Sequence, residues 1–192
     1  MQLKIRFKQG MALQKEVSFP YFNPIEKKII YSALDEAADY LREFYCFSPR
    51  EWFNHCYDLK TELEGEVNCS PKKAFAEVRQ YTPIRENFSL FPKERYQICL
   101  FDKNILRTLW KQSNMEFYPF MVYILTHELV HVARFCQNLH PFDCDQESLQ
   151  KEEEKVNQLT QQVLNIKKSE TFDKISSLYH WASSVHSVSA SA

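Results

Sequence analysis

The chain has 192 residues, enough for one domain with a hydrophobic core, and 44% of them are hydrophobic. Its formal net charge of −1 gives no overall field that would attract nucleic acid or an anionic membrane, so neither partner is expected. Fifteen per cent aromatic residues and only two glycines indicate a folded, helix-rich protein rather than a disordered chain.

The first third of the chain carries strand-like and then helix-like patterns. Apolar and polar residues alternate over residues 2–8, as in a half-buried strand, and residues 17–21 can pair back with it. Apolar residues recur every three to four positions over residues 24–47, which predicts a long amphipathic helix. Ser48-Pro49-Arg50-Glu51 is a capping box with proline in the first turn, so a second helix is expected through residue 63.

The middle of the chain predicts strands followed by a helix. Residues 70–83 alternate weakly like a strand, although Ser70-Pro71 can also start a helix. Residues 87–90 and 96–101 flank a proline-containing turn and predict a hairpin, whose second arm is the strongest strand pattern in the chain. Asp102 is expected to cap a helix through residue 112.

An apolar run at residues 123–135 contains His127-Glu128-Leu129-Val130-His131. Two histidines four positions apart share one face of a helix, while apolar residues recur on the opposite face. This pattern predicts a helix, capped by Ser113 or Asn114, with a core side and a chemical side. The run before His127 is too short to span a bilayer.

The His-Glu-x-x-His motif indicates a zinc site. Neutral imidazoles bind Zn²⁺, and a catalytic site uses three protein ligands, so one further ligand is needed beyond His127 and His131. A carboxylate beside the first histidine, here Glu128, can accept a proton from an activated water. A metzincin would have glycine and histidine where this chain has Arg134 and Gln137, which excludes that class.

A second helix is expected at residues 150–166, and it carries three consecutive acids. Glu152 lies at the centre of its apolar stripe, and a buried carboxylate needs a partner such as zinc. Glu153 lies at the edge of the stripe and has Asn157 one turn further on, while Glu154 points towards solvent. The residues alone therefore leave Glu152 and Glu153 open as the third ligand.

With this spacing the chain resembles the gluzincin zinc metallopeptidases, most closely their minimal soluble members and the HtpX and ImmA groups. Their pattern is His-Glu-x-x-His followed by a glutamate, a small residue three positions later and an aspartate or asparagine after that. The resemblance covers residues 113–164, and Val156 departs from it because those groups prefer alanine there. It implies zinc ligands at His127, His131 and Glu153, a general base at Glu128, and a histidine-orienting role for Asn157.

The expected fold is α+β, helix-rich and zincin-like, with a small, twisted, mainly antiparallel sheet packed on the zinc-binding helix. One metallopeptidase domain is expected over residues 1–192. Its sheet and first helices lie in residues 1–112, its ligand helices in 113–168, and a C-terminal helix at 172–185 with a frayed tail in 169–192. The resemblance also implies that an edge strand of the sheet binds an extended peptide, and residues 96–101 are the candidate, with a covered central strand as the alternative.

The predicted activity is zinc-dependent hydrolysis of peptide bonds in a peptide or protein substrate. The alternative is a regulatory or metal-sensing protein that keeps the zinc motif without turnover. Arg134 can hold a substrate carboxylate, pair with Glu154 or simply be solvated, and oxyanion donors can come from His140 or from the last helix. The six cysteines form no Cys-x-x-Cys pair and no secretory signal is evident, so reduced thiols and a cytoplasmic location are expected.

Overall fold

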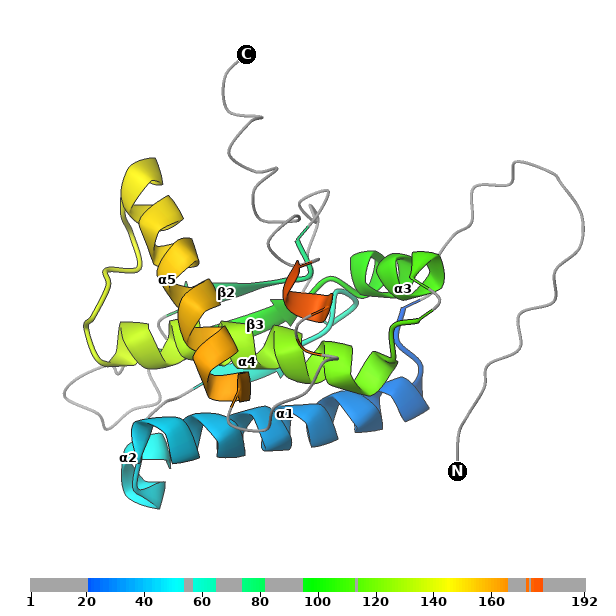
Figure 1. Ribbon diagram of the computed structural model, residues 1–192, viewed down its shortest axis with the longest axis horizontal. Coiled ribbons are helices and arrows are strands. Elements are labelled where there is room, and N and C mark those ends of the chain that lie inside the picture. Colours follow the sequence, from blue (N-terminus) through cyan, green and yellow to red (C-terminus); the bar gives the residue numbers. More distant parts are fainter. Residues whose placement is uncertain are drawn as a thin grey trace, which may run out of the picture.

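The computed structural model describes residues 21–53, 57–64, 74–81, 95–112, 114–165, 172 and 174–177. It is a helix-rich α+β protein, in which long helices pack beside one small sheet (Figure 1). Its elements are α1 (Pro24–Tyr45), α2 (Pro49–Phe53), β1 (Tyr57–Lys60), β2 (Ala76–Tyr81), β3 (Arg95–Leu100), α3 (Asp102–Lys111), α4 (Phe117–Cys136) and α5 (Gln146–Asn165). The expected strands at 2–8 and 17–21, the hairpin arm at 87–90 and most of the expected helix at 172–185 lie outside the described residues.

The sheet is mixed rather than mainly antiparallel. Its strand order is β1-β3-β2, with β1 parallel and β2 antiparallel to β3. Ile98 in β3 therefore faces Leu59 on one side and Val78 on the other. The prediction that β3 is an edge strand is wrong, because both of its backbone edges are already used in pairing.

The predicted helix at residues 24–47 is confirmed as α1, and local signals fix both of its ends. The Asn23 side chain accepts hydrogen bonds from the backbone N–H groups of Ile25 and Glu26, at 2.9 and 3.0 Å, and the Glu26 carboxylate accepts from the Asn23 N–H at 2.8 Å. This capping box satisfies N–H groups that the first turn would leave unpaired. The helix ends at Tyr45 because Cys46 takes the left-handed conformation, with φ of 53°.

The second predicted helix begins where expected but is far shorter. Ser48 and Glu51 form the capping box, with the Glu51 N–H donating to Ser48 Oγ at 3.2 Å, yet α2 ends at Phe53. Tyr57–Lys60 is instead strand β1, bonded in parallel to β3. The prediction of a helix through residue 63 is wrong because pairing with a distant strand overrides the local pattern.

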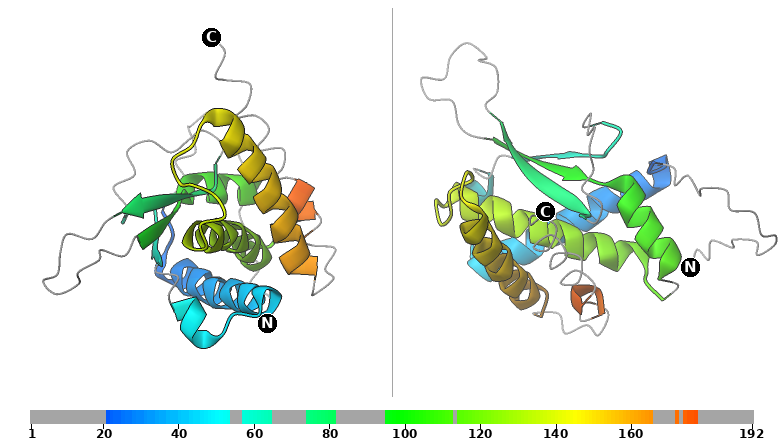
Figure 2. Two further views of the ribbon diagram at one scale, coloured as in Figure 1. Left: turned by 90° about the vertical axis from the view of Figure 1, so that its left-hand side faces the viewer. Right: turned by 90° about the horizontal axis from the view of Figure 1, so that it is seen from above.

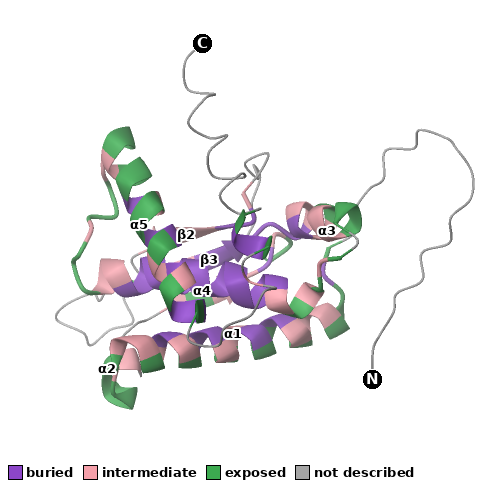
Figure 3. Cartoon of the chain, viewed as in Figure 1, coloured by how far each residue is buried: buried purple, intermediate pink, exposed green. Residues whose placement is uncertain are grey.

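Helix α4 is the centre of the molecule. It packs against α1, α5 and β2, and the view along its axis in Figure 2 shows α1 below it and α5 beside it. Every residue from Phe120 to Ala133 is buried, and Figure 3 shows this as a continuous buried segment. Both the apolar and the chemical side of the predicted amphipathic helix are thus covered by other elements.

The starts of the last three helices differ in detail from the sequence predictions. Asp102 is the first residue of α3 rather than its cap, and its carboxylate accepts hydrogen bonds from the Phe22 and Glu62 N–H groups at 3.2 and 2.9 Å. The N-cap of α4 is Glu116 instead of Ser113 or Asn114. Helix α5 starts at Gln146 because Asp145 Oδ1 accepts from the Ser148 N–H at 2.8 Å. None of the described helices is both long and apolar enough to cross a membrane.

Candidate metal centre

The motif residues lie in the middle of α4, on the side that faces α5. His127, Glu128 and His131 are 2%, 3% and 6% exposed, so all three polar side chains are buried. Four-residue spacing places the two imidazoles one turn apart, with ring centroids 5.0 Å from each other. Buried polar groups require partners, which must come from a neighbouring element.

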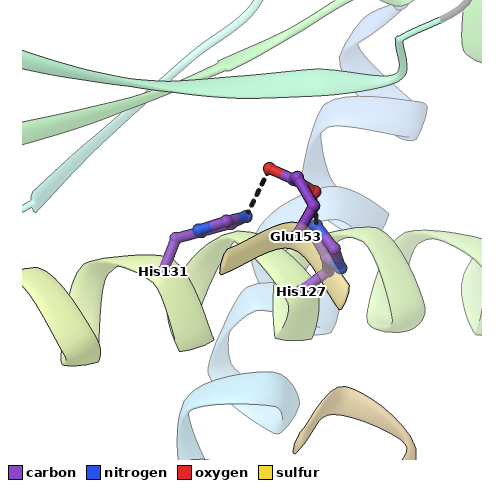
Figure 4. Close-up of side chains that lie close together, drawn as sticks. All are labelled: His127, His131 and Glu153. Atoms are coloured by element: carbon purple, nitrogen blue, oxygen red, sulfur yellow. Dashed lines mark ion pairs between the residues drawn. The ribbon is translucent and has the colours of Figure 1, made fainter. Parts of the chain in front are cut away.

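Helix α5 supplies a carboxylate to these histidines. Glu153 Oε1 lies 3.2 Å from His131 Nε2, and Oε2 lies 3.5 Å from His127 Nε2 (Figure 4). The Glu153 side chain thus bridges the two rings from above α4. Val156, Thr160 and Val163 are fully buried on α5, and they seat this helix so that Glu153 reaches α4.

The three residues have the donor set and spacing of a metal site. One ligand atom from each of His127, His131 and Glu153 lies within 4.8 Å of the others, and in the described part of the chain no other histidine, cysteine or acid group gathers in this way. Ligand atoms about 2.0–2.1 Å from a tetrahedral zinc ion stand roughly 3.3 Å apart. The two histidine–carboxylate separations of 3.2 and 3.5 Å fit that arrangement. The sequence-predicted ligand residues are therefore brought together.

Glu152 and Glu154, the neighbours of Glu153 in the sequence, do not face the two histidines. Arg134 Nε and one of its terminal nitrogens donate to the two oxygens of Glu152, at 2.6 and 2.8 Å. Glu154 is exposed. The expected pairing of Arg134 with Glu154 is wrong, because Arg134 pairs with Glu152 instead. A contact between Arg134 and a substrate carboxylate stays a prediction. The Glu152 carboxylate, which sequence reasoning left open as a zinc ligand, is satisfied by arginine instead.

Val156 and Asn157, the last two positions of the pattern that the chain shares with the gluzincins, are both buried on α5. Asn157 is 3% exposed, and its Oδ1 has no hydrogen-bond partner among the described residues. The same holds for His131 Nδ1. The role of Asn157 in orienting a histidine remains a prediction.

An aromatic stack that sequence reasoning missed supports His131. The centroid of the Phe135 ring lies 5.8 Å from that of the His131 ring at an interplanar angle of 20°, and Tyr96 of β3 also stacks with Phe135, at 5.7 Å. Phe142, from the loop between α4 and α5, packs edge-on against Phe135 at 5.2 Å. The available signal was the spacing of Phe135, four residues after His131 on the same helix face.

Of the oxyanion candidates, His140 lies beside Phe135, with ring centroids 6.4 Å apart, and the last-helix candidates lie outside the described residues.

When no ion is bound, Glu153 and His131 shift each other's pKa. Burial alone raises the pKa of Glu153, but the nearby charge of His131 and hydrogen bonding to both histidines outweigh it and hold that pKa well below its ordinary value of 4.5. Burial lowers the pKa of His131, yet Glu153, and to a lesser degree Glu128 and Glu152, raise it above 6.5. Below its raised pKa, His131 carries a proton that a bound metal ion would displace.

This coupling predicts the pH dependence of the metal-free protein. The lowered pKa of Glu153 gives stability that is present above about pH 4.5 and is lost as pH falls through the folded-state pKa of Glu153. The raised pKa of His131 gives stability that is present below about pH 6.5 and is lost as pH rises through the folded-state pKa of His131. Thermal unfolding between pH 4 and 8 should show this contribution complete between those two values. Glu153→Gln should flatten the profile, and an unchanged profile in that variant would show that the pair does not contribute.

Comparison with protein-family models, with curated proteins and with solved structures gives no match for this chain.

Proposed function

We propose that this protein is a zinc-dependent peptidase with a zincin-like fold, of the gluzincin type. The observation that carries the proposal is the convergence of His127, His131 and Glu153 from two helices, with Glu128 beside them on α4. Two imidazoles and one carboxylate are a ligand set found in catalytic zinc sites, whereas structural sites usually have four protein ligands with several cysteines. The described part of the chain offers three ligands, which leaves a position for water.

Each residue then has a defined task. His127, His131 and Glu153 would hold the ion, and a bound zinc ion supplies Lewis-acid chemistry that lowers the pKa of water and polarises a carbonyl group. Glu128 is not part of the ligand group, and its carboxylate would accept a proton from the attacking water and pass it to the leaving amine. Its burial, at 3% exposure, keeps bulk water away from that transfer.

The substrate strand is assigned to β2 in place of β3. Among the described residues β2 pairs only with β3, and it packs against α4, so it is an edge strand beside the helix that carries the histidines. In the view of Figure 4, strands of the sheet pass above His127, His131 and Glu153. An extended peptide that added to the open edge of Ala76–Tyr81 would place its backbone along the site.

We propose that the reaction takes place in the cytoplasm. Cys46, Cys99, Cys136 and Cys144 are free thiols in the part of the chain that the structure describes, while Cys56 and Cys69 lie outside it. Free thiols are ordinary in a reducing compartment. The near-zero net charge supports a peptide or protein substrate rather than nucleic acid or a membrane surface.

The test is metal content. The purified protein, after zinc re-addition and removal of excess, is expected to hold about one zinc ion per chain and to lose peptide hydrolysis in a chelator, because three side chains and one water complete the site. Elemental analysis and calorimetric titration measure this, with the His127→Ala/His131→Ala variant as the metal-free control. A wild-type protein that takes up no zinc under these conditions would remove both the peptidase and the metal-sensing functions.

A further inference from the structure

The ion pair between Arg134 and Glu152, near the candidate metal centre, is bidentate and buried. Arg134 and Glu152 meet through two parallel hydrogen bonds of 2.6 and 2.8 Å, in the fork geometry that only arginine can offer to a carboxylate. Their side chains are 13% and 2% exposed, so the pair is shielded from water. A hydrogen-bond fork in such surroundings is directional, whereas the apolar contacts around it are not.

The pair joins the two helices beside their ligand residues. Arg134 lies on α4 one turn beyond His131, and Glu152 lies on α5 immediately before Glu153. Successive side chains of a helix point about 100° apart, so fixing the direction of Glu152 also fixes the direction of Glu153. Burial raises the pKa of the Tyr45 hydroxyl on α1, and the charges of Arg134 and Glu152 lower and raise that pKa in turn.

The rest of the contact between α5 and α4 does not specify the rotation of α5 as sharply. Val156 and Val163 are fully buried, and apolar residues of this kind tolerate small rotations and shifts of a helix. A small rotation would nevertheless move the Glu153 oxygens away from the two imidazoles. Accurate ligand placement therefore needs a directional contact close to Glu153.

We propose that Arg134 and Glu152 are positioning residues, which set the rotation of α5 so that the Glu153 carboxylate faces His127 and His131. The inference rests on the proposed function, because it concerns the affinity of the site for zinc. It also explains why a charged pair is kept at a buried place. Replacing a buried ion pair by apolar residues of similar size is often neutral or stabilising, so the contribution that we assign to this pair is geometric.

The decisive variant replaces the pair without leaving a lone charge. Arg134→Met/Glu152→Met fills the same space with apolar side chains, so the metal-free protein should unfold at the same denaturant concentration as wild type or higher. Its zinc affinity should fall by roughly 10- to 100-fold, the range seen when groups that orient ligands are removed. A purely structural pair would give the opposite result, lower stability with unchanged affinity for zinc.

A second variant and a control keep the test decisive if the double variant does not fold. Arg134→Lys retains the charge but cannot make the fork, so its zinc affinity should lie between those of wild type and the double variant. Glu154→Gln, on the exposed side of α5, should bind zinc like wild type. Wild-type zinc affinity in both Arg134 variants would overturn this inference alone, whereas a wild-type protein without zinc would overturn the proposed function as well.

Discussion

Glu128→Gln is expected to keep its zinc and to lose peptide hydrolysis by roughly 10²- to 10⁴-fold in kcat, the range that general acid–base catalysis contributes. The amide has nearly the same size and remains buried, so the helix around it should be undisturbed. It cannot accept a proton from water, and the three ligand residues are untouched. The measurement is kcat on a peptide substrate beside zinc stoichiometry for the same preparation.

Two other outcomes of that experiment have clear meanings. If Glu128→Gln loses zinc together with activity, then Glu128 ligates the metal and its assigned role is wrong. If wild-type protein binds zinc tightly but cleaves nothing in a broad peptide library, then the motif serves metal sensing or regulation. Unfolding measurements on both proteins separate these cases from a simple loss of structure.

Glu153→Gln is expected to weaken zinc binding by more than about 100-fold, since even the loss of a group that only orients a ligand costs 10- to 100-fold. The neutral amide cannot replace the charge that faces His127 and His131 at 3.5 and 3.2 Å. Calorimetric or competition titration with a zinc chelator measures the change.

The matched control is Glu154→Gln, which makes the same chemical change at the next position on the same helix. Glu154 is exposed and lies outside the ligand group, so its zinc affinity should equal that of wild type. Glu153→Gln with the affinity of Glu154→Gln would show that the carboxylate does not ligate, and the third ligand would have to be sought elsewhere.

The long helices could be predicted from the sequence, because their signals are local. The apolar periodicity of α1, α4 and α5 is a feature of neighbouring residues, as is the capping box at Ser48 that begins the short helix α2. Strand β1 could not be predicted in this way. Tyr57–Lys60 is a strand because it pairs with β3, whose residues are far away in the sequence, and the same long-range pairing makes β3 central.

In the candidate site, too, the features set by neighbouring residues could be predicted from the sequence, and those set by contacts between helices could not. His127, Glu128 and His131 form a local motif, and their arrangement follows from helix geometry. The choice between Glu152 and Glu153 depended on a contact across helices, with Glu152 bound to Arg134, 18 residues earlier in the chain. The reasoning that a buried glutamate needs a partner was sound, but the sequence did not reveal that the partner is a guanidinium group.

The uneven exposure of the three ligand residues bears on how fast an ion could enter and leave. The His127 and His131 side chains are 3% and 8% exposed, whereas that of Glu153 is 36% exposed. An arriving ion would therefore meet the carboxylate first and would shed its hydration shell there before it reached either imidazole. Helix α4 is enclosed by α1, α5 and β2, so we expect exchange of an ion with solvent to require local opening of α5. If zinc binds here as proposed, we therefore expect it to leave the site slowly.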